Sequence, residues 1–340
     1  MRLNRSLLRK IKIFLQSKAV VLMYHRIDDL TFDPWHLAVS PANFEQQLQV
    51  LKKNYSVIPL TELFADLQRG RIRSGSTCIT FDDGYVDNYL HAKPLLEKYR
   101  CPATFFIANK YIGNEQQYWW DELQNIILSP EELPSSISLP IDGAVFSFQL
   151  KNDGKITRDE WEKQRTWYYE EPPVTYRCEL YLQLWEKLKP LPYNEITEML
   201  SKIRDWAGGK RFTEKNSLPM SKTQLSTLTR HPLIDLGIHT MTHLSLPAHT
   251  AAEQEKEIGG NKQYLESECS RKINTMAYPY GDYNEKSLDV VKKLNVDIAV
   301  TTEEKVVTGR TQQHQVGRFQ VHNWNGEDFE KNLRLWMRGY

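Results

Sequence analysis

The sequence predicts an α/β protein in which parallel strands alternate with helices. Short apolar runs rich in β-branched and aromatic residues, typical of buried strands, occupy 19–25, 78–81 and 103–108. Segments with apolar residues at helical spacing lie between them, at 41–51 and 86–99. This alternation favours a parallel sheet, either doubly wound or closed as a barrel.

The alternation stops for about a hundred residues and then resumes. Between about 111 and 220, a hairpin that turns at Asp142-Gly143 is followed by three helical stretches. We therefore expect a single barrel-like domain over 19–340 that carries a mainly helical insertion at about 111–220. The later strands are expected at 233–239, 275–280, 297–302 and 316–321, and the later helices at 250–267, 284–294 and 326–338.

Composition is that of a globular protein without a nucleic-acid partner. The chain has 340 residues, 40% hydrophobic and 26% charged, enough to bury a full core. Lys plus Arg number 44 against 43 Asp plus Glu, and a net charge of +1 argues against a nucleic-acid footprint over the whole protein. The four cysteines show no paired spacing, which favours reduced thiols in a cytoplasmic protein.

Residues 1–18 form a distinct basic segment. They contain six Lys or Arg and no acidic residue, interleaved with leucine, isoleucine and phenylalanine. The pattern suits a basic amphipathic helix on an anionic membrane surface, and equally a helix packed on the domain. Charges interrupt the apolar stretch, which argues against a signal peptide, and no run approaches the ~18 apolar residues of a membrane span. We expect a cytoplasmic protein, with peripheral contact at the inner membrane surface as an open alternative.

Two acids and two histidines carry the chemistry of the sequence. Asp82 and Asp83 end a strand before Gly84, so both carboxylates reach one rim, where one can bind a metal while the other handles a proton. Alone, Asp-Asp-Gly is also an ordinary turn. His239 and His243, four residues apart, could be core histidines or part of a helix cap. Joined to one carboxylate, they make a two-His-one-Asp site that suits metal-assisted hydrolysis.

Three segments resemble the first three motifs of the polysaccharide deacetylases, carbohydrate esterase family four. They are Thr-Phe-Asp-Asp-Gly at 80–84, His-Thr-Met-Thr-His at 239–243 and Ala-Tyr-Pro-Tyr-Gly at 277–281. Order and strand context match as well as letters, over about 19–110 and 220–325. The resemblance implies a distorted (β/α) barrel with fewer than eight strands and a metal-dependent hydrolase that removes N-acetyl groups from amino sugars.

The resemblance also implies roles for individual residues. Asp82 would be the catalytic base, and Asp83, His239 and His243 would bind a divalent metal ion, with zinc expected and cobalt or nickel as alternatives. Tyr280 would lie in the substrate groove, where its backbone amide helps to hold the oxyanion.

The third motif lacks the arginine with which many members brace the base. Arg318, on the predicted strand 316–321, could supply this brace from elsewhere and would join Tyr280 on the substrate side of the site. The alternative is a surface arginine.

The general acid is also expected at a different place in the sequence, on the first strand and not on a late one. No late strand ends in the family's apolar-apolar-His pattern, whereas the early strand 19–25 does and ends in His25. A permuted branch, resembling the poly-N-acetylglucosamine deacetylases, carries its acid near the N-terminus. We therefore expect His25 to protonate the leaving amine, because the first and last strands of a barrel are neighbours and either can donate the residue. The alternative is a hydrogen-bonded core histidine.

The predicted function is removal of N-acetyl groups from a poly- or oligosaccharide in cell-envelope glycan assembly. The basic N-terminus and the absence of a signal peptide favour a lipid-linked substrate, which makes a deformylase acting on a lipid-linked amino sugar a close alternative. A non-catalytic glycan-binding barrel is a third hypothesis, against which the complete set of site residues argues. Four aromatic residues could stack on sugar rings or only join the insertion to the barrel: Tyr118, Trp119, Trp120 and Trp324.

Overall fold

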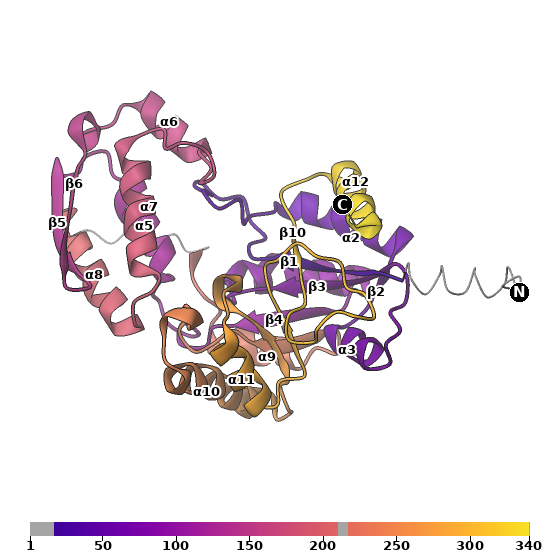
Figure 1. The fold of residues 1–340 in the computed structure, drawn as a ribbon. Coiled ribbons are helices and arrows are strands. Elements are labelled where there is room, and N and C mark those ends of the chain that lie inside the picture. The colour runs from indigo at the N-terminus through magenta and orange to yellow at the C-terminus, as the bar shows by residue number, and fades with distance from the viewer. Residues whose placement is uncertain (1–16, 210–216, 340) are drawn as a thin grey trace, which may run out of the picture.

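A curled parallel sheet forms the centre of the computed structural model, which describes residues 17–209 and 217–339 (Figure 1). β2 (Ser56–Val57) pairs with the start of β3 beside the main path of the sheet. The alternation of strands and helices in the sequence is thus confirmed as a parallel α/β fold. In the order of pairing, the main path runs through β10 (Phe319–Gln320), β1 (Ala19–Tyr24), β3 (Ser76–Phe81), β4 (Ala103–Ile107), β7 (Ile234–Ile238), β8 (Thr275–Ala277) and β9 (Ile298–Val300).

The two ends of this path meet, which makes the sheet a distorted barrel. Val316 forms a parallel bridge with Val300 of β9, and the Thr301 N–H donates to the Val316 carbonyl at 2.8 Å. Three residues further on, Phe319 pairs with β1. The chain leading into β10 therefore links β9 to β1, and the barrel has fewer than eight strands along its path, as the resemblance implied.

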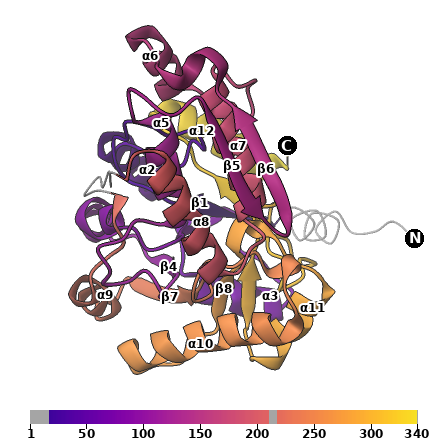
Figure 2. The ribbon, with the colours of Figure 1, turned by 90° about the vertical axis from the view of Figure 1, so that its left-hand side faces the viewer.

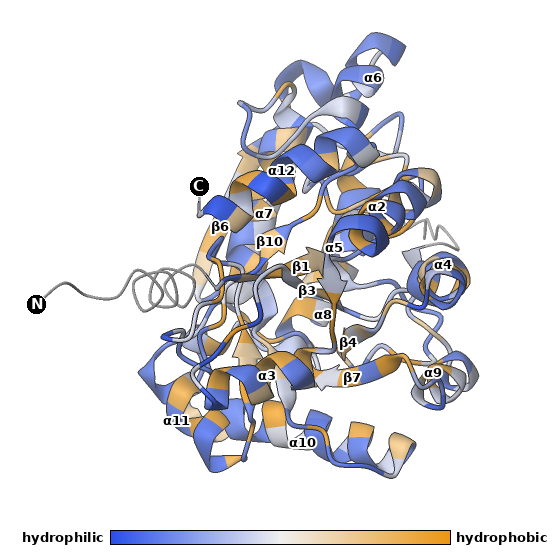
Figure 3. Ribbon diagram, turned by 90° about the vertical axis from the view of Figure 1, so that its right-hand side faces the viewer, coloured by the Kyte–Doolittle hydropathy of each residue, from blue (hydrophilic) through white to orange (hydrophobic). Residues whose placement is uncertain are grey.

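Alternate residues of each central strand face two different hydrophobic cores. In β1, Leu22 and Tyr24 pack with the covering helices, whereas Ala19 and Val21 pack with residues of four other strands in the middle of the barrel. Because both faces are covered, β1 is a continuous apolar run, and β3 and β4 add only small hydroxyl side chains to their apolar residues; Figure 3 colours the chain by hydropathy.

Helices cover the outside of the barrel. The Ser40 hydroxyl caps α2 by accepting from the Asn43 N–H (3.2 Å), and Pro41 occupies the first turn, as the sequence predicts. A π-helical segment, Asn88–Ala92, precedes α4. The sequence does not predict α9, because eight residues are too few for clear periodicity. The helices are α2 (Pro41–Asn54), α3 (Leu60–Gln68), α4 (Lys93–Tyr99), α9 (Lys222–Thr229), α10 (Ala251–Cys269), α11 (Glu285–Lys293) and α12 (Gly326–Arg338).

Residues 119–206 form a separate lobe at the end of the barrel toward which β1 and β3 run (Figures 1 and 2). The predicted turn at Asp142-Gly143 is confirmed, with positive φ at both residues. The sequence does not predict α5, whose first turn is crowded with aromatic and acidic side chains. The lobe contains α5 (Trp119–Leu128), β5 (Ser136–Ile141), β6 (Ala144–Gln149), α6 (Arg158–Thr166), α7 (Tyr176–Leu188) and α8 (Tyr193–Trp206), with a hydrophobic core of its own.

The basic segment 1–18 lies outside the described residues except for its last two positions. Lys18 donates from Nζ to the Arg338 carbonyl at 2.6 Å, so the start of β1 lies beside the end of α12. Among the described residues, no helix has the length and hydropathy that crossing a membrane requires.

Candidate active site

The carboxyl ends of the parallel strands bring the predicted residues to one rim of the barrel. His25 follows β1, Asp82 and Asp83 follow β3, His239 follows β7, and Tyr280 follows β8. Strands that run in the same direction end at the same edge, which is why residues more than two hundred positions apart become neighbours. All of these side chains, with His243, line a cavity of about 270 Å³.

Asp83, His239 and His243 form a candidate metal site. The Asp83 Oδ1 atom lies 3.4 Å from Nε2 of each histidine, and the three ligand atoms are all within 4.8 Å of one another. Within the described chain, this buried oxygen has no hydrogen-bond partner. An unsatisfied carboxylate oxygen that faces two imidazole nitrogens fits a cation, because burial of such an oxygen is costly without a partner.

Hydrogen bonding and burial act on the two histidines of this candidate site. The His239 Nδ1–H donates to the Ala277 carbonyl (2.8 Å), which leaves the Nε2 lone pair directed at the site. Burial lowers the pKa of His243 to about 3, so this ring is neutral and can act as a ligand. Burial acts in the same direction on His239, but the adjacent Asp83 and Asp82 carboxylates outweigh it and raise the pKa of His239.

Left-handed backbone turns orient two of the candidate ligands and Tyr280. Asp83, His243 and Tyr280 have φ values of 72°, 60° and 59°, a left-handed region that non-glycine residues rarely occupy. The Tyr118 hydroxyl donates to the Asp83 carbonyl at 2.9 Å and supports the first of these turns. At Gly84 (φ 98°), a side chain would meet Ile107 at 3.0 Å, so only glycine fits.

Asn261 on α10 is a supporting residue that the sequence gives no reason to select. Its Oδ1 accepts from the His239 N–H (3.0 Å), and its Nδ2 donates to the Ile107 carbonyl (2.9 Å) and to the Asn109 side chain (2.6 Å). One buried amide therefore fixes the exits of β4 and β7 against each other. No spacing rule connects a mid-helix asparagine to a strand end.

Arg318 holds Asp82 through two hydrogen bonds and does not line the cavity. Its two terminal nitrogens each donate to one Asp82 oxygen at 2.7 Å, and Nε donates to the Thr301 carbonyl at 3.0 Å. Burial opposes ionisation of Asp82, but the Arg318 charge and hydrogen bonds outweigh it and hold the pKa of Asp82 far below its ordinary value. Arg318 is fully buried, so it is not a surface arginine, and it lies outside the cavity lining. The expectation that Arg318 lies on the substrate side of the site is therefore wrong: Arg318 contacts Asp82 and does not line the cavity.

His25 lies beside Asp82 at the cavity wall. Its Nε2 is 3.8 Å from Asp82 Oδ2, and its side chain is 15% exposed. Its Nδ1 has no hydrogen-bond partner in the part of the chain that the structure describes, which differs from the hydrogen-bonded core histidine of the alternative. Burial lowers the pKa of His25, although both nearby aspartates oppose this effect.

The remaining cavity wall comes from the insertion and from the loop after β1. Trp35, Tyr169, Trp185 and Lys189 line it, and the sequence gives no motif that selects them. Of the aromatic residues considered from the sequence, Trp120 lines the cavity, with its ring centroid 4.7 Å from that of His243. Tyr118 and Trp119 are buried in the core of the lobe, and Trp324 packs against Trp336.

A second polar network lies beneath this wall. The Tyr85 hydroxyl donates to Asp121 Oδ2 (2.9 Å) and accepts from Trp120 Nε1 (2.7 Å). The Arg26 guanidinium pairs with Asp87 at 2.5 Å and stacks over the Tyr85 ring. Burial raises the pKa of Asp121 to about 7, so this carboxyl is largely protonated below neutral pH.

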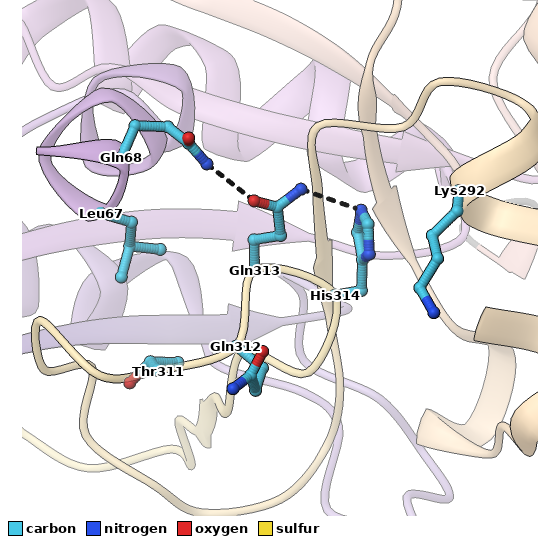
Figure 4. A pocket seen from close by; sticks show the side chains of 7 residues that line it. All are labelled: Leu67, Gln68, Lys292, Thr311, Gln312, Gln313 and His314. Carbon is cyan, nitrogen blue, oxygen red and sulfur yellow. Dashed lines mark hydrogen bonds between the residues drawn. The ribbon is translucent and has the colours of Figure 1, made fainter. Parts of the chain in front are cut away.

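Another cavity, of about 420 Å³, lies at the opposite edge of the sheet, where α3 and α11 lead into strands. Gln313 stands there between Gln68 and His314 (Figure 4), accepting from the Gln68 amide at 2.7 Å. The residues lining it are Leu67, Gln68, Lys292, Thr311, Gln312, Gln313 and His314, with no carboxylate among them. Its chemistry is that of satisfied amides, and we assign it no role.

Comparisons with known proteins agree with this geometry. The family model for polysaccharide deacetylase matches residues 70–135 and 203–299, on either side of most of the insertion. The poly-β-1,6-N-acetyl-D-glucosamine N-deacetylase of Staphylococcus aureus is 21% identical over 341 aligned residues, which cover 96% of this chain and 86% of that protein.

Two solved structures share the fold. IcaB from Ammonifex degensii superposes with a TM-score of 0.58 at 18% identity and covers 95% of this chain and 97% of its own. The deacetylase PplD of Streptococcus pyogenes, in complex with acetate, gives 0.57 at 19% identity, with 94% and 98% covered. The resemblance seen in the motifs is thereby confirmed: the chain is similar to the polysaccharide deacetylases in sequence and in fold.

Proposed function

We propose that the protein is a metal-dependent hydrolase that removes N-acetyl groups from amino sugars of a cell-envelope glycan. The observation that carries the proposal is the meeting of Asp83, His239 and His243 with Asp82 and His25 at one cavity. The match to the polysaccharide deacetylase family and the named activity of the staphylococcal relative support the same substrate class.

The three candidate ligands fit a divalent cation of the zinc type. Two neutral imidazoles and one carboxylate are the usual ligands of zinc, cobalt or nickel, and three protein ligands leave coordination positions open. An ion held there would supply Lewis acidity, which activates water and polarises a carbonyl group. We propose zinc, with cobalt and nickel as alternatives.

Asp82 is suited to accept the proton of the attacking water. Arg318 keeps it ionised and fixes its plane, so the carboxylate is oriented before substrate arrives. A carboxylate held by two hydrogen bonds retains lone pairs on the side away from the guanidinium, and these face the cavity that Asp82 lines.

His25 is suited to deliver a proton to the leaving amine. Because its pKa is lowered, the ring is neutral at neutral pH and must first gain a proton. Asp82, 3.8 Å away, is the nearest source once it has taken a proton from water, after a small approach of the two groups. We assign the Tyr280 backbone amide to the oxyanion, since Tyr280 lines the same cavity.

The test is release of acetate from N-acetylglucosamine oligomers by the metal-loaded protein. Asp82→Asn is expected to abolish release, and Asp142→Asn, the same change in an exposed turn, to leave it unaltered. Normal turnover by Asp82→Asn would disprove the role of that acid. Oligomer binding without any acetate would favour the glycan-binding barrel, and formate release from N-formyl sugars alone would favour the deformylase.

His25→Ala tests the proposed role of His25 as the general acid. We expect a fall in kcat of about 10²–10⁴-fold, the usual contribution of a general acid, with little change in KM. Replacing the amine with a leaving group that needs no proton should restore most of the rate. Full activity of His25→Ala on the amide substrate would remove this residue from the mechanism.

We also propose that the protein is cytoplasmic and touches the inner membrane surface through residues 1–18. Their six basic residues support this, because each contributes roughly 1 kcal/mol near an anionic surface. Co-sedimentation with anionic vesicles is expected to exceed that with neutral vesicles, and equal recovery would disprove the electrostatic contact.

A further inference from the structure

We propose that the site admits a single terminal N-acyl amino sugar and excludes internal units of a chain, because the insertion encloses the rim. This inference rests on the proposed function and specifies its substrate. Figure 2 views the molecule from the side of the insertion, which stands in front of the barrel strands. The insertion contacts the rim at three separate places around the candidate metal site.

The first contact lies above β3 and β7. The Tyr118 hydroxyl donates to the Asp83 carbonyl at 2.9 Å, and the Trp120 ring lies against His243 with centroids 4.7 Å apart. Both aromatic residues are buried, so the lobe leaves no gap here. A glycan cannot pass between α5 and the metal ligands.

The second contact lies above β8. The edge of Trp185 on α7 meets the Tyr280 ring (centroids 5.8 Å apart), and Lys189 Nζ pairs with Asp282 Oδ2 at 2.6 Å. The Lys189 ammonium also lies 4.6 Å from the centre of the Tyr280 ring. An ion pair together with two ring contacts ties the end of α7 to the loop after β8.

The third contact joins the insertion to the loop after β1. Trp35 packs between Tyr169 and Trp185, with centroid distances of 4.4 and 4.5 Å, and its indole N–H donates to the Tyr181 hydroxyl at 2.7 Å. The Tyr169 N–H donates to the Pro34 carbonyl at 2.9 Å. These bonds hold the aromatic wall in place over the ends of β1 and β10.

Thr302, after β9, is the one exposed residue of the cavity lining, whereas the other lining residues are buried or half-buried, so the opening lies on the side of Thr302. An internal sugar needs two exits for its chain, whereas a terminal sugar needs one. The cavity of about 270 Å³ has the volume of roughly nine water molecules, at the lower end of small-molecule sites. That is room for one ring with its acyl group, and the half-buried face of Trp185 offers the ring a flat apolar partner.

Binding tests the inference without depending on catalysis. The probes are β-1,6-linked N-acetylglucosamine tetramers carrying a bulky substituent on one terminal sugar or on the other, titrated into the metal-loaded protein. Blocking one end is expected to weaken binding at least about 10-fold, and blocking the other to have no effect. Equal binding of both blocked tetramers and the free tetramer would overturn the inference.

Product analysis provides the second readout. With the free tetramer, we expect one acetate per chain, lost from one end. Acetate lost from internal units would overturn the inference and leave the proposed function intact, whereas one-ended binding without acetate would uphold the inference and refute the deacetylase.

Variants of Trp185 and Tyr169 test whether the aromatic wall causes the end selectivity. Trp185→Ala, or Tyr169→Ala if the first does not fold, should admit the blocked end and weaken binding of the free tetramer about 3- to 10-fold through loss of stacking. Trp206→Ala is the matched control in the same lobe, since its indole bonds Ser136 away from the cavity. Retained end selectivity in both wall variants would overturn the inference.

Discussion

The barrel rim and the insertion contribute to the same cavity by different means. The rim presents charged and titratable side chains from strand ends and from the turn after β7: His25, Asp82, Asp83, His239 and His243. The insertion presents mainly aromatic surface from a lobe with its own hydrophobic core. The difference teaches that in this molecule the candidate reacting groups and most of the aromatic wall beside them come from separate parts of the chain.

The physical reason lies in the precision that each task needs. Ligand and proton-transfer groups must be held within fractions of an ångström, and strand ends locked by bonds such as those of Arg318 and Asn261 provide this. A wall needs only shape and rigidity, which packed aromatic rings such as Trp35 and Trp185 provide. Four predictions test this division, from the largest effect to the smallest.

Loss of a rim ligand should have the largest effect. His239→Ala removes one of the three proposed ligands, and we expect metal content to fall below detection and kcat/KM to fall by at least about 10³-fold. Metal analysis and acetate release measure the two effects. His231→Ala, on the surface, should retain metal and activity. A metal-loaded and active His239→Ala would break the assignment of chemistry to the rim.

Arg318→Lys should have the next largest effect. The substitution keeps a positive charge but cannot donate to both Asp82 oxygens, so we expect kcat to fall about 10- to 100-fold with KM unchanged. Arg318→Met leaves the buried carboxylate without its partner and should cost about 3–5 kcal/mol of unfolding free energy. Unchanged kcat in the lysine variant would show that the bidentate geometry does not matter.

Tyr118→Phe asks whether the insertion affects the rim. It removes only the hydroxyl that supports the Asp83 turn, and we expect metal to bind about 10-fold more weakly, with the cavity wall intact. Competition with a chelator measures the affinity, and Tyr176→Phe on the outside of the lobe is the control. An unchanged metal affinity would show that the insertion does not influence metal binding at the rim.

Asp121→Asn should change only stability. The pKa of Asp121 is about 7 in the folded protein, so the folded state keeps a proton between pH 4 and 7 that the unfolded chain loses. Its contribution is therefore present at low pH and is lost as the pH rises through 7. We expect the wild type to lose about 1–2 kcal/mol more than the variant between pH 5 and 8, a discounted value because the side chain is only half-buried.

Urea unfolding at the two pH values measures this difference, with acetate release as the check on the rim. Parallel pH dependence in the two proteins would show that Asp121 titrates normally. Lost activity in Asp121→Asn would show that the network beneath the wall takes part in the chemistry.

The strand pattern and the motifs were sufficient to predict the parallel barrel and the convergence of six residues. Apolar runs such as 78–81 define strands locally, and parallel strands end at one edge, so Asp82, Asp83 and His239 meet whatever the loops do. The apolar run 19–25 likewise placed His25 at a strand exit, and the structure brings it beside Asp82 because β1 pairs with β3. Roles within that group remain proposals, since position does not determine which acid moves a proton.

The tertiary structure decided what local pattern does not encode. The Arg318–Asp82 pair joins residues 236 positions apart, and Asn261 reaches β4 from the middle of a helix. The wall of Trp35, Tyr169 and Trp185 depends on how a lobe with its own core docks on the rim. Periodicity reports which face of an element is buried, whereas these contacts depend on which elements meet, and that is set by packing across the whole chain.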